Sequence, residues 1–414
     1  MRTIHSGTWW PDDRAEARYR YLPVDVPAGA RRLTVTLTYD TGAGVLDLGC
    51  LDPDGRFRGW SGGARSEFTI TGPWATPGYL RGPVSPGSWR VILGLHRVPP
   101  EGLPWTVRAE PALSVPDPPH PVPAVPADGP ADGPGAGRSP ARPPARDLPA
   151  LPGLRWLAGD LHAHTVHSDG VLTVTELAVL AAGSGLDFLA VTDHNTVSHH
   201  DELPAAAAAT GLVLVPGQEL TTDRGHANAY GDIGWVDFRR PADAWVSTVD
   251  ERGGLLSVNH PLGADFAWLH RLDTRPPLAE VWHSGWWDRT WGAPLAWLLA
   301  WGTDTVPVGG SDFHAPRPGE LPGRPTTWVA CADRTVDGVL AGLAAGRVAV
   351  TASPTGPVLV RVGDELVAVD ADGTLLVDFT GRRRPVRGAR VVFPAAAGPY
   401  WLEDHRAQVL AICS

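Results

Sequence analysis

The chain has 414 residues and a formal net charge of −10, with 43% hydrophobic and 19% charged residues. This length allows two or three domains, and the composition is that of a globular protein with an ample core. Because no lysine and arginine cluster could follow a phosphate backbone, nucleic acid is not expected as a partner. Cys50, Cys331 and Cys413 are too far apart in the sequence to indicate a disulfide framework or a thiolate metal site.

The sequence contains no recognisable membrane or export segment. Residues 1–10 have no apolar core of signal-peptide length, and the longest apolar stretch, 177–191, is interrupted by Gly183, Gly185 and Asp187. We therefore expect a cytoplasmic protein without a membrane partner. The oligomeric state is not indicated.

Residues 19–112 show the pattern of an all-β domain. Short alternating runs at 33–39, 67–70, 88–95 and 105–109 are separated by turn-forming residues, which predicts a β-sandwich accessory domain over 1–115. Its tryptophans fit core packing better than a sugar-stacking surface. Three roles remain open for this domain: it could hold a polymer, cap the active site or form a dimerisation surface.

A proline-rich segment follows the predicted sandwich. Proline occupies 12 of the 34 residues from 116 to 149, and none of these residues is aromatic. Such a segment buries little apolar area, so we expect an extended, poorly ordered linker over 116–150.

From residue 151 to 354, strand patterns alternate with helix patterns, and Thr173 and Glu176 form a capping-box motif at one helix start. This alternation predicts parallel strands joined by helical crossovers. Short alternating runs return over 355–414 and predict a β-rich C-terminal extension. The expected strands are 157–161, 186–192, 212–215, 255–258, 278–282 and 306–308, and the expected helices are 173–182, 201–210, 242–252, 294–301 and 336–345.

Nearly every strand in this region ends in an ionisable residue. In a barrel of parallel strands, the carboxyl ends converge on one face, where catalysis occurs. Imidazole and carboxylate groups without a thiolate suit Zn, Mn or Fe, and nine such groups suit two or three divalent metal ions. The candidates are His162, His164, Asp169, His194, Glu219, His226, His260, Asp312 and His314.

The motifs that carry these residues resemble the polymerase-and-histidinol-phosphatase (PHP) superfamily over residues 154–352. They are His-x-His-Thr-x-x-Ser-Asp-Gly, Thr-Asp-His, Pro-Gly-x-Glu, Gly-His, Asn-His-Pro and Gly-Ser-Asp-x-His, in this order. Within the superfamily, the motifs around His194, His226 and Glu280 are similar to those of the CehA/McbA (carbaryl-hydrolase-like) branch. The resemblance implies a distorted (β/α)7 barrel, similar to a TIM barrel, with a di- or trinuclear site.

The resemblance also implies how the ligands are shared among the metals. Glu219 would bridge two of the metals. The first metal would take His162, His164, Glu219 and Asp312; the second Glu219, His226 and His260; the third Asp169, His194 and His314.

Hydrolysis by a metal-bridging hydroxide is the chemistry that such a site supports. Asp160 and Asp193 flank ligand histidines and could orient their imidazoles, or could simply form turns. His283 could protonate the leaving group, or could be structural. The candidate catalytic residues are therefore Glu219, His194, His283 and Asp193.

Residues near the motifs suggest two kinds of substrate. Arg224 and Arg317 could bind a substrate anion, which favours a phosphoesterase acting on a small phosphomonoester or phosphodiester. Alternatively, tryptophans could line an apolar pocket, which favours a carboxyl or carbamate ester hydrolase. A non-catalytic binding module is the third alternative. We expect His167 and the segment 199–202 to face solvent. The pocket tryptophans would be Trp282, Trp286, Trp287 and Trp291.

Overall fold

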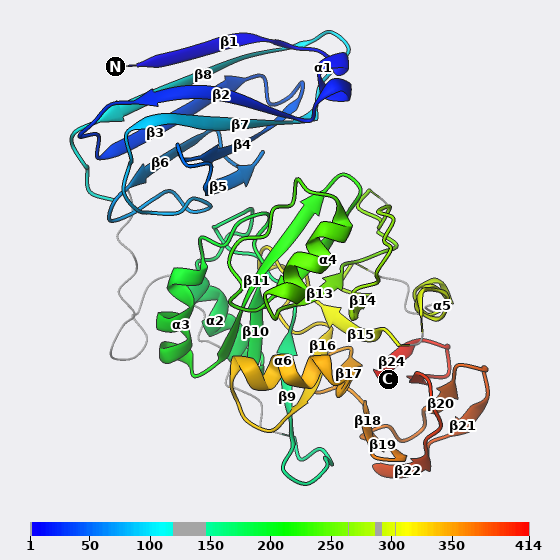
Figure 1. Ribbon diagram of the computed structural model, residues 1–414. Helices are drawn as coiled ribbons and strands as arrows, with labels where there is room; N and C mark the ends of the chain where they lie inside the picture. Colours follow the sequence, from blue (N-terminus) through cyan, green and yellow to red (C-terminus); the bar gives the residue numbers. More distant parts are fainter. Residues whose placement is uncertain (1, 119–145, 264, 286–291, 303, 414) are drawn as a thin grey trace. The chain divides into compact units, whose positions relative to one another are not determined.

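The computed structural model describes residues 2–118, 146–263, 265–285, 292–302 and 304–413 (Figure 1). The chain divides into two compact units. The first is Met1–Ala127 with the two segments Val166–Asp169 and Asp193–Asp201, and the second is the remainder of the chain. Residues 119–145, most of the predicted linker, lie outside the described residues.

The first unit contains two four-stranded antiparallel sheets, and the short helix α1 (Pro11–Glu16) joins β1 to β2. Side chains from both sheets, including the fully buried Trp89 and Phe68, form one apolar core. The expected all-β fold is confirmed, and Trp60, Trp89 and Trp105 are buried as core packing requires. One sheet is ordered β1 (Thr3–Trp9), β8 (Leu103–Ala112), β3 (Arg32–Tyr39) and β6 (Glu67–Thr71); the other is β2 (Tyr19–Val26), β7 (Gly87–Arg97), β4 (Val45–Leu51) and β5 (Phe57–Gly62).

A sheet of thirteen strands forms the centre of the second unit (Figure 1). Six of its strands run parallel, as the alternation of strands and helices predicts. Between β11 and β13 lies β12 (Gly225–Tyr230), an antiparallel strand that the sequence analysis did not predict. The parallel strands are β9 (Arg155–Asp160), β10 (Phe188–Val191), β11 (Val213–Thr222), β13 (Leu255–Val258), β14 (Leu278–His283) and β15 (Val306–Gly310).

Helices connect these strands close to the predicted positions. The capping box of α2 is formed, with the side chain of Thr173 accepting from the backbone N–H of Glu176. Among the helices of the described residues, none is long and apolar enough to cross a bilayer. The helices are α2 (Val174–Gly183), α3 (Leu203–Thr210, preceded by the 3₁₀ turn η1, His200–Glu202), α4 (Ala242–Glu251), α5 (Gly292–Trp301) and α6 (Val336–Ala344).

The sheet curves so that two strands that are far apart in the strand order come into contact. β16 (Thr326–Cys331) pairs with β9, and its residue Thr327 also reaches β15. The hydroxyl of Thr327 donates to the carbonyl of Gly309 at 2.8 Å and accepts from the N–H of Gly309 at 2.8 Å. Because β15 is the first strand in the order and β16 the eighth, this link brings the ends of β9 to β15 around a common interior.

The C-terminal region is β-rich, as expected. It extends the large sheet and also forms a separate sheet in the order β18-β19-β22. Leu366, Leu376 and Leu402 are buried in a core of their own. The strands are β17 (Val348–Thr351), β18 (Val358–Val362), β19 (Glu365–Val369), β20 (Leu375–Asp378), β21 (Arg383–Pro385), β22 (Arg390–Pro394), β23 (Tyr400–Glu403) and β24 (Val409–Cys413).

The described end of the predicted linker is not extended free chain. Arg146 forms an ion pair with Asp370 at 2.6 Å, and Leu148 is buried in the core beside β9. Trp156 donates its indole N–H to the carbonyl of Pro149 at 2.8 Å. The composition of the segment could not predict these contacts. One arginine and one leucine are enough to anchor a segment that is otherwise rich in proline.

Candidate metal centre

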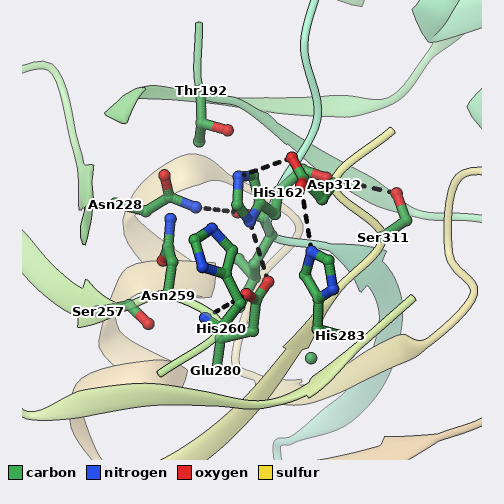
Figure 2. A network of polar contacts seen from close by, with 12 residues as sticks. His162, Thr192, Asn228, Ser257, Asn259, His260, Glu280, His283, Ser311 and Asp312 are labelled. Carbon is green, nitrogen blue, oxygen red and sulfur yellow. Dashed lines mark hydrogen bonds and ion pairs between the residues drawn. The ribbon is translucent and has the colours of Figure 1, made fainter. Parts of the chain in front are cut away.

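His162 is the centre of a buried polar network in the second unit (Figure 2). It follows β9, and its Nε2 lies 3.2 Å from Oε1 of Glu219 and 3.2 Å from Oδ1 of Asp312. On the other side of the ring, Nδ1 lies 3.0 Å from Oε1 of Glu280. Carboxylates from β11, from β14 and from the end of β15 therefore surround one imidazole.

His164 brings a second imidazole to the same carboxylates. Its Nε2 lies 2.9 Å from Oδ1 of Asp312 and 3.6 Å from Oε2 of Glu219. The ring of His314 stacks on the ring of His164, with 4.2 Å between centroids. The His-x-His spacing thus directs both histidines to one point, as the sequence analysis predicts.

Glu219 is contacted by two further histidines. Its Oε1 lies 3.1 Å from Nδ1 of His226 and 3.4 Å from Nε2 of His260, and it accepts an amide hydrogen from Asn259 at 2.9 Å. This fully buried carboxylate has four imidazoles within 3.6 Å, those of His162 and His164 included, and such donors suit divalent metal ions.

The local fold that presents Glu219 differs from the expected one. The sequence analysis expected its strand to end at residue 215, but β11 continues to Thr222. There it forms a hairpin with β12, which sets Glu219 opposite Asn228 and Thr221 opposite His226. The strand pattern failed here because Pro216 and Gly217 look like a turn. In the structure Gly217 is close to Thr192, where a Cβ would lie 2.8 Å from the Thr192 methyl group.

Two of the candidate ligands have unusual backbone conformations. His260 has φ +26° and Asp312 has φ +50°, which are values that non-glycine residues rarely adopt. Such strain is found where a fold requires a side chain to point in one direction, and it accumulates at functional sites.

Glu280 belongs to this cluster but was not predicted as a site residue. Its Oε2 accepts the backbone N–H of His260 at 2.9 Å, while its Oε1 contacts His162, and the residue is 2% exposed (Figure 2). A carboxylate in the middle of β14, within a hydrophobic run from Leu278 to Trp282, was the signal that could have identified it.

His283 has a defined proton arrangement. The N–H of Gly285 donates to its Nδ1 at 3.0 Å, so the neutral ring carries its hydrogen on Nε2 and donates to Oδ2 of Asp312 at 3.1 Å. Burial opposes the charged form, but the hydrogen bond to Asp312 together with the negative charges of Glu280 and Asp312 outweighs it and raises the pKa of His283.

Asp160 acts on the backbone and not on an imidazole. It is fully buried and accepts the backbone N–H groups of His162, Ser311 and Gly323 at 3.1, 3.0 and 2.7 Å. Burial raises the pKa of Asp160, although these hydrogen bonds oppose the shift. Asp160 thus joins the loops after β9 and β15, which carry His162 and Asp312.

Asp169 and His194 lie together in the first unit, with Oδ1 and Nε2 3.5 Å apart. In the same unit, Asp193 accepts a hydrogen bond from the hydroxyl of Ser168 at 2.6 Å and contacts Nδ1 of His199 at 3.1 Å. Asp193 thus contacts His199. The sequence analysis expected it either to orient a ligand histidine or to form a turn.

The expectation that His167 and His199 face solvent is wrong. They are 5% and 0% exposed, and Nδ1 of His167 lies 2.7 Å from the hydroxyl of Ser198. Within the segment 199–202 only Asp201 is exposed, and its side chain is 63% exposed. The sequence could not predict this burial, because a single polar residue such as His167 or His199 does not belong to a periodic pattern.

The donors of the second unit suit divalent metal ions. His162, His164 and Glu219 offer ligand atoms within 4.8 Å of one another, and so do His162, His260 and Asp312. Nε2 of His162 is buried and has no hydrogen bond, although two carboxylate oxygens are 3.2 Å away. An imidazole nitrogen and carboxylate oxygens that converge in this way fit a cation better than they fit one another.

The pKa shifts of His162 and Asp312 are also consistent with a cation at this cluster. Burial opposes the imidazolium form, but the carboxylates of Asp312 and Glu219 raise the pKa of His162 well above its usual value. Burial would also raise the pKa of Asp312, but His162 and the hydrogen bonds of other histidines hold it well below its usual range. The ionised carboxylate of Asp312 is therefore available to a cation.

A cavity of about 300 Å³ adjoins Asp312 and His283. Trp282, Phe313 and Arg324 are among the residues that line it. Trp286, Trp287 and Trp291 lie outside the described residues, so the predicted tryptophan wall is represented by Trp282 alone.

The two predicted anion-binding arginines have contacts elsewhere. Arg224 is exposed and donates to the carbonyl of Leu269 at 3.0 Å. Arg317, whose side chain is 68% exposed, pairs with Glu320 at 3.8 Å.

Comparison with known proteins found two curated relatives over short stretches. One is a 5'-3' exoribonuclease of Haemophilus influenzae, 44% identical over 64 residues, which are 16% of this chain and 23% of that protein. The other is a 3',5'-nucleoside bisphosphate phosphatase of Chromobacterium violaceum, 41% identical over 105 residues, which are 25% of this chain and 36% of that protein. The chain thus spans about a quarter and a third of the length of these relatives. No family model matches the chain.

Among solved structures, the chain is similar to a two-domain protein of Bacteroides vulgatus that contains a predicted PHP-like metal-dependent phosphoesterase. The identity is 18% and the TM-score 0.42, and the match covers 68% of this chain and 92% of that one.

Proposed function

We propose that this protein is a metal-dependent phosphoesterase of the PHP superfamily, acting on a small phosphomonoester or phosphodiester. The observation that carries the proposal is the buried carboxylate of Glu219 with four histidines around it. The names of the two curated relatives, a nuclease and a phosphatase, both denote phosphoester hydrolysis. The order of the motifs from His162 to His314 supports the same superfamily.

In this proposal the ligands are those that the resemblance implies. His162, His164, Glu219 and Asp312 hold one divalent ion, and Glu219 also serves a second with His226 and His260. Asp169, His194 and His314 hold a third. The bound ions would supply an activated hydroxide and stabilise the charge that develops on the phosphoryl oxygens.

Other residues of the chain position the ligands and move a proton. Glu280 accepts a hydrogen from Nδ1 of His162, which leaves Nε2 as the ligand atom. His283 lines the cavity and has a raised pKa, so its imidazolium form could donate a hydrogen to a leaving-group oxygen. Arg324 also lines the cavity and can meet a phosphate, a role that the sequence analysis gave to Arg224 and Arg317.

The proposal includes a domain arrangement. Residues 1–115 are the accessory sandwich, 116–150 the linker, 151–354 the catalytic domain and 355–414 the C-terminal extension. The catalytic domain is a distorted (β/α)7 barrel, which the six parallel strands and the contact of β15 with β16 support.

Hydrolysis of a carboxyl or carbamate ester is the second candidate, as in the CehA/McbA branch. Trp282 favours it, because an indole that lines the cavity beside His283 could pack against an aromatic ester.

The test measures metal content and ester turnover on the same preparation. Protein purified without chelator is analysed for metals and assayed with p-nitrophenyl phosphate, bis-p-nitrophenyl phosphate, a 3',5'-nucleoside bisphosphate and 1-naphthyl N-methylcarbamate. We expect two or three metals per chain and turnover of a phosphate ester that is lost in Glu219→Ala but kept in Glu365→Gln, an exposed control. Turnover of the carbamate alone would favour the second candidate. Less than one metal per chain and no turnover would refute both.

A further inference from the structure

Two segments outside the N-terminal sequence belong to the first unit together with the sandwich. They are Val166–Asp169 and Asp193–Asp201, and they carry Asp169 and His194. Both segments receive hydrogen bonds from residues in the connections between sandwich strands. The conformation of the Asp169 and His194 pair is therefore not set by the catalytic region alone.

Arg65, in the connection between β5 and β6, contacts the first segment. Its guanidinium donates to the carbonyl of Ser168 at 3.0 Å and to the carbonyl of Val166. The same charge is attracted by Asp193 and Asp169. Two donors on one rigid guanidinium plane fix the backbone immediately before Asp169.

Gly78, in the connection between β6 and β7, contacts the second segment. Its N–H donates to the hydroxyl of Ser198 at 3.0 Å, and its carbonyl accepts from the hydroxyl of Thr196 at 2.9 Å. With φ +96°, a Cβ at this position would lie 2.8 Å from the carbonyl oxygen of Trp60 and 3.0 Å from that of His167. Only glycine allows this close backbone approach.

The two segments are also joined to each other. His167 contacts Ser198 at 2.7 Å, and the hydroxyl of Ser168 donates to Asp193 at 2.6 Å. These groups are buried, so their hydrogen bonds are shielded from water and costly to break. Displacement of one segment therefore affects the other.

We propose that the N-terminal sandwich positions two candidate metal ligands, Asp169 and His194, and is not an independent binding module. In this view, which rests on the proposed function, Arg65 and Gly78 are positioning residues that hold Asp169 and His194 ready for one metal ion. The ligands proposed for the other metal positions lie in the second unit, so we expect these positions not to depend on the sandwich.

The test compares Arg65→Met with Arg81→Met in the full-length protein. Arg81 also lies in the sandwich, but its ion pair with Asp201 is exposed, so it is a matched control. Metal binding is measured by titration with Mn²⁺ or Zn²⁺ and elemental analysis. We expect Arg65→Met to bind one ion about 10-fold to 100-fold more weakly, and Arg81→Met to bind as the wild type does. Arg65→Lys, which keeps the charge, should recover part of the loss.

Ser198→Ala is the second variant, in case Arg65→Met does not fold. It removes the acceptor for Gly78 and the contact with His167, and it should weaken the same ion. If the wild type binds metal and hydrolyses ester while both variants bind every ion normally, this inference is refuted and the proposed function stands. If the wild type binds no metal, both are refuted.

Discussion

Replacement of Glu280 by glutamine tests how the cluster selects the ligand atom of His162. The two oxygens of Glu280 face two hydrogens, one on Nδ1 of His162 and one on the backbone nitrogen of His260. Glutamine offers one oxygen and one NH₂ group, so it sets a donor against one of these hydrogens. If His162 responds by moving its hydrogen to Nε2, the atom that faces Glu219 and Asp312 can no longer bind a metal.

The expected loss of metal affinity follows from the contact of Glu280 with His162, a proposed metal ligand. Loss of such a partner weakens metal binding about 10-fold to 100-fold. At a free metal concentration 100 times the dissociation constant, the metal stabilises the wild-type fold by about 2.7 kcal/mol, and a tenfold weaker site retains about 1.4 kcal/mol. Without metal, Glu280→Gln still sets a buried amide against a hydrogen, so the effect on metal binding is the difference between the stability losses measured with and without metal.

The assay is a metal titration together with urea unfolding, each with and without chelator. Glu365→Gln makes the same chemical change on the exposed face of β19 and serves as the control. Glu280→Gln should lose metal-dependent stability, whereas the control should not. Equal metal affinity of Glu280→Gln and the wild type would refute the assignment of Glu280 as the partner that orients His162.

Three further predictions concern other parts of the molecule. Removal of metal with EDTA should abolish ester hydrolysis and lower the unfolding temperature, and Mn²⁺ or Zn²⁺ should restore both; turnover that survives EDTA would contradict the metal proposal. Gly78→Ala should destabilise the first unit by about 1–3 kcal/mol in urea unfolding. The loss should exceed that of Gly363→Ala, since Gly363 also has positive φ but open space around it. Asp160→Asn should cost about 1–3 kcal/mol, because the amide cannot accept all three backbone N–H groups. A cost below about 0.5 kcal/mol, the range of ordinary surface changes, would count against its organising role.

The sequence analysis located most candidate ligands because metal sites of this kind leave a local pattern. A histidine or carboxylate directly after an apolar run is visible without any structure, and His162, His260 and Asp312 all follow strands. Helix boundaries were equally local, as the capping box of Thr173 shows. Glu280 was not identified because it lies inside an apolar strand, and its partners, His162 and His260, follow β9 and β13.

The sequence by itself determined the kinds of donor, their order and the alternation of strands and helices, since each depends on residues a few positions apart. Tertiary structure decided which donors share a carboxylate, because the contacts of Glu219 join residues up to 57 positions apart, from His162 to Glu219. It also decided that His167 and His199 are buried and that Arg65 contacts a segment about 100 residues later. Such contacts depend on how the chain packs in space, and a linear pattern of residue types does not record them.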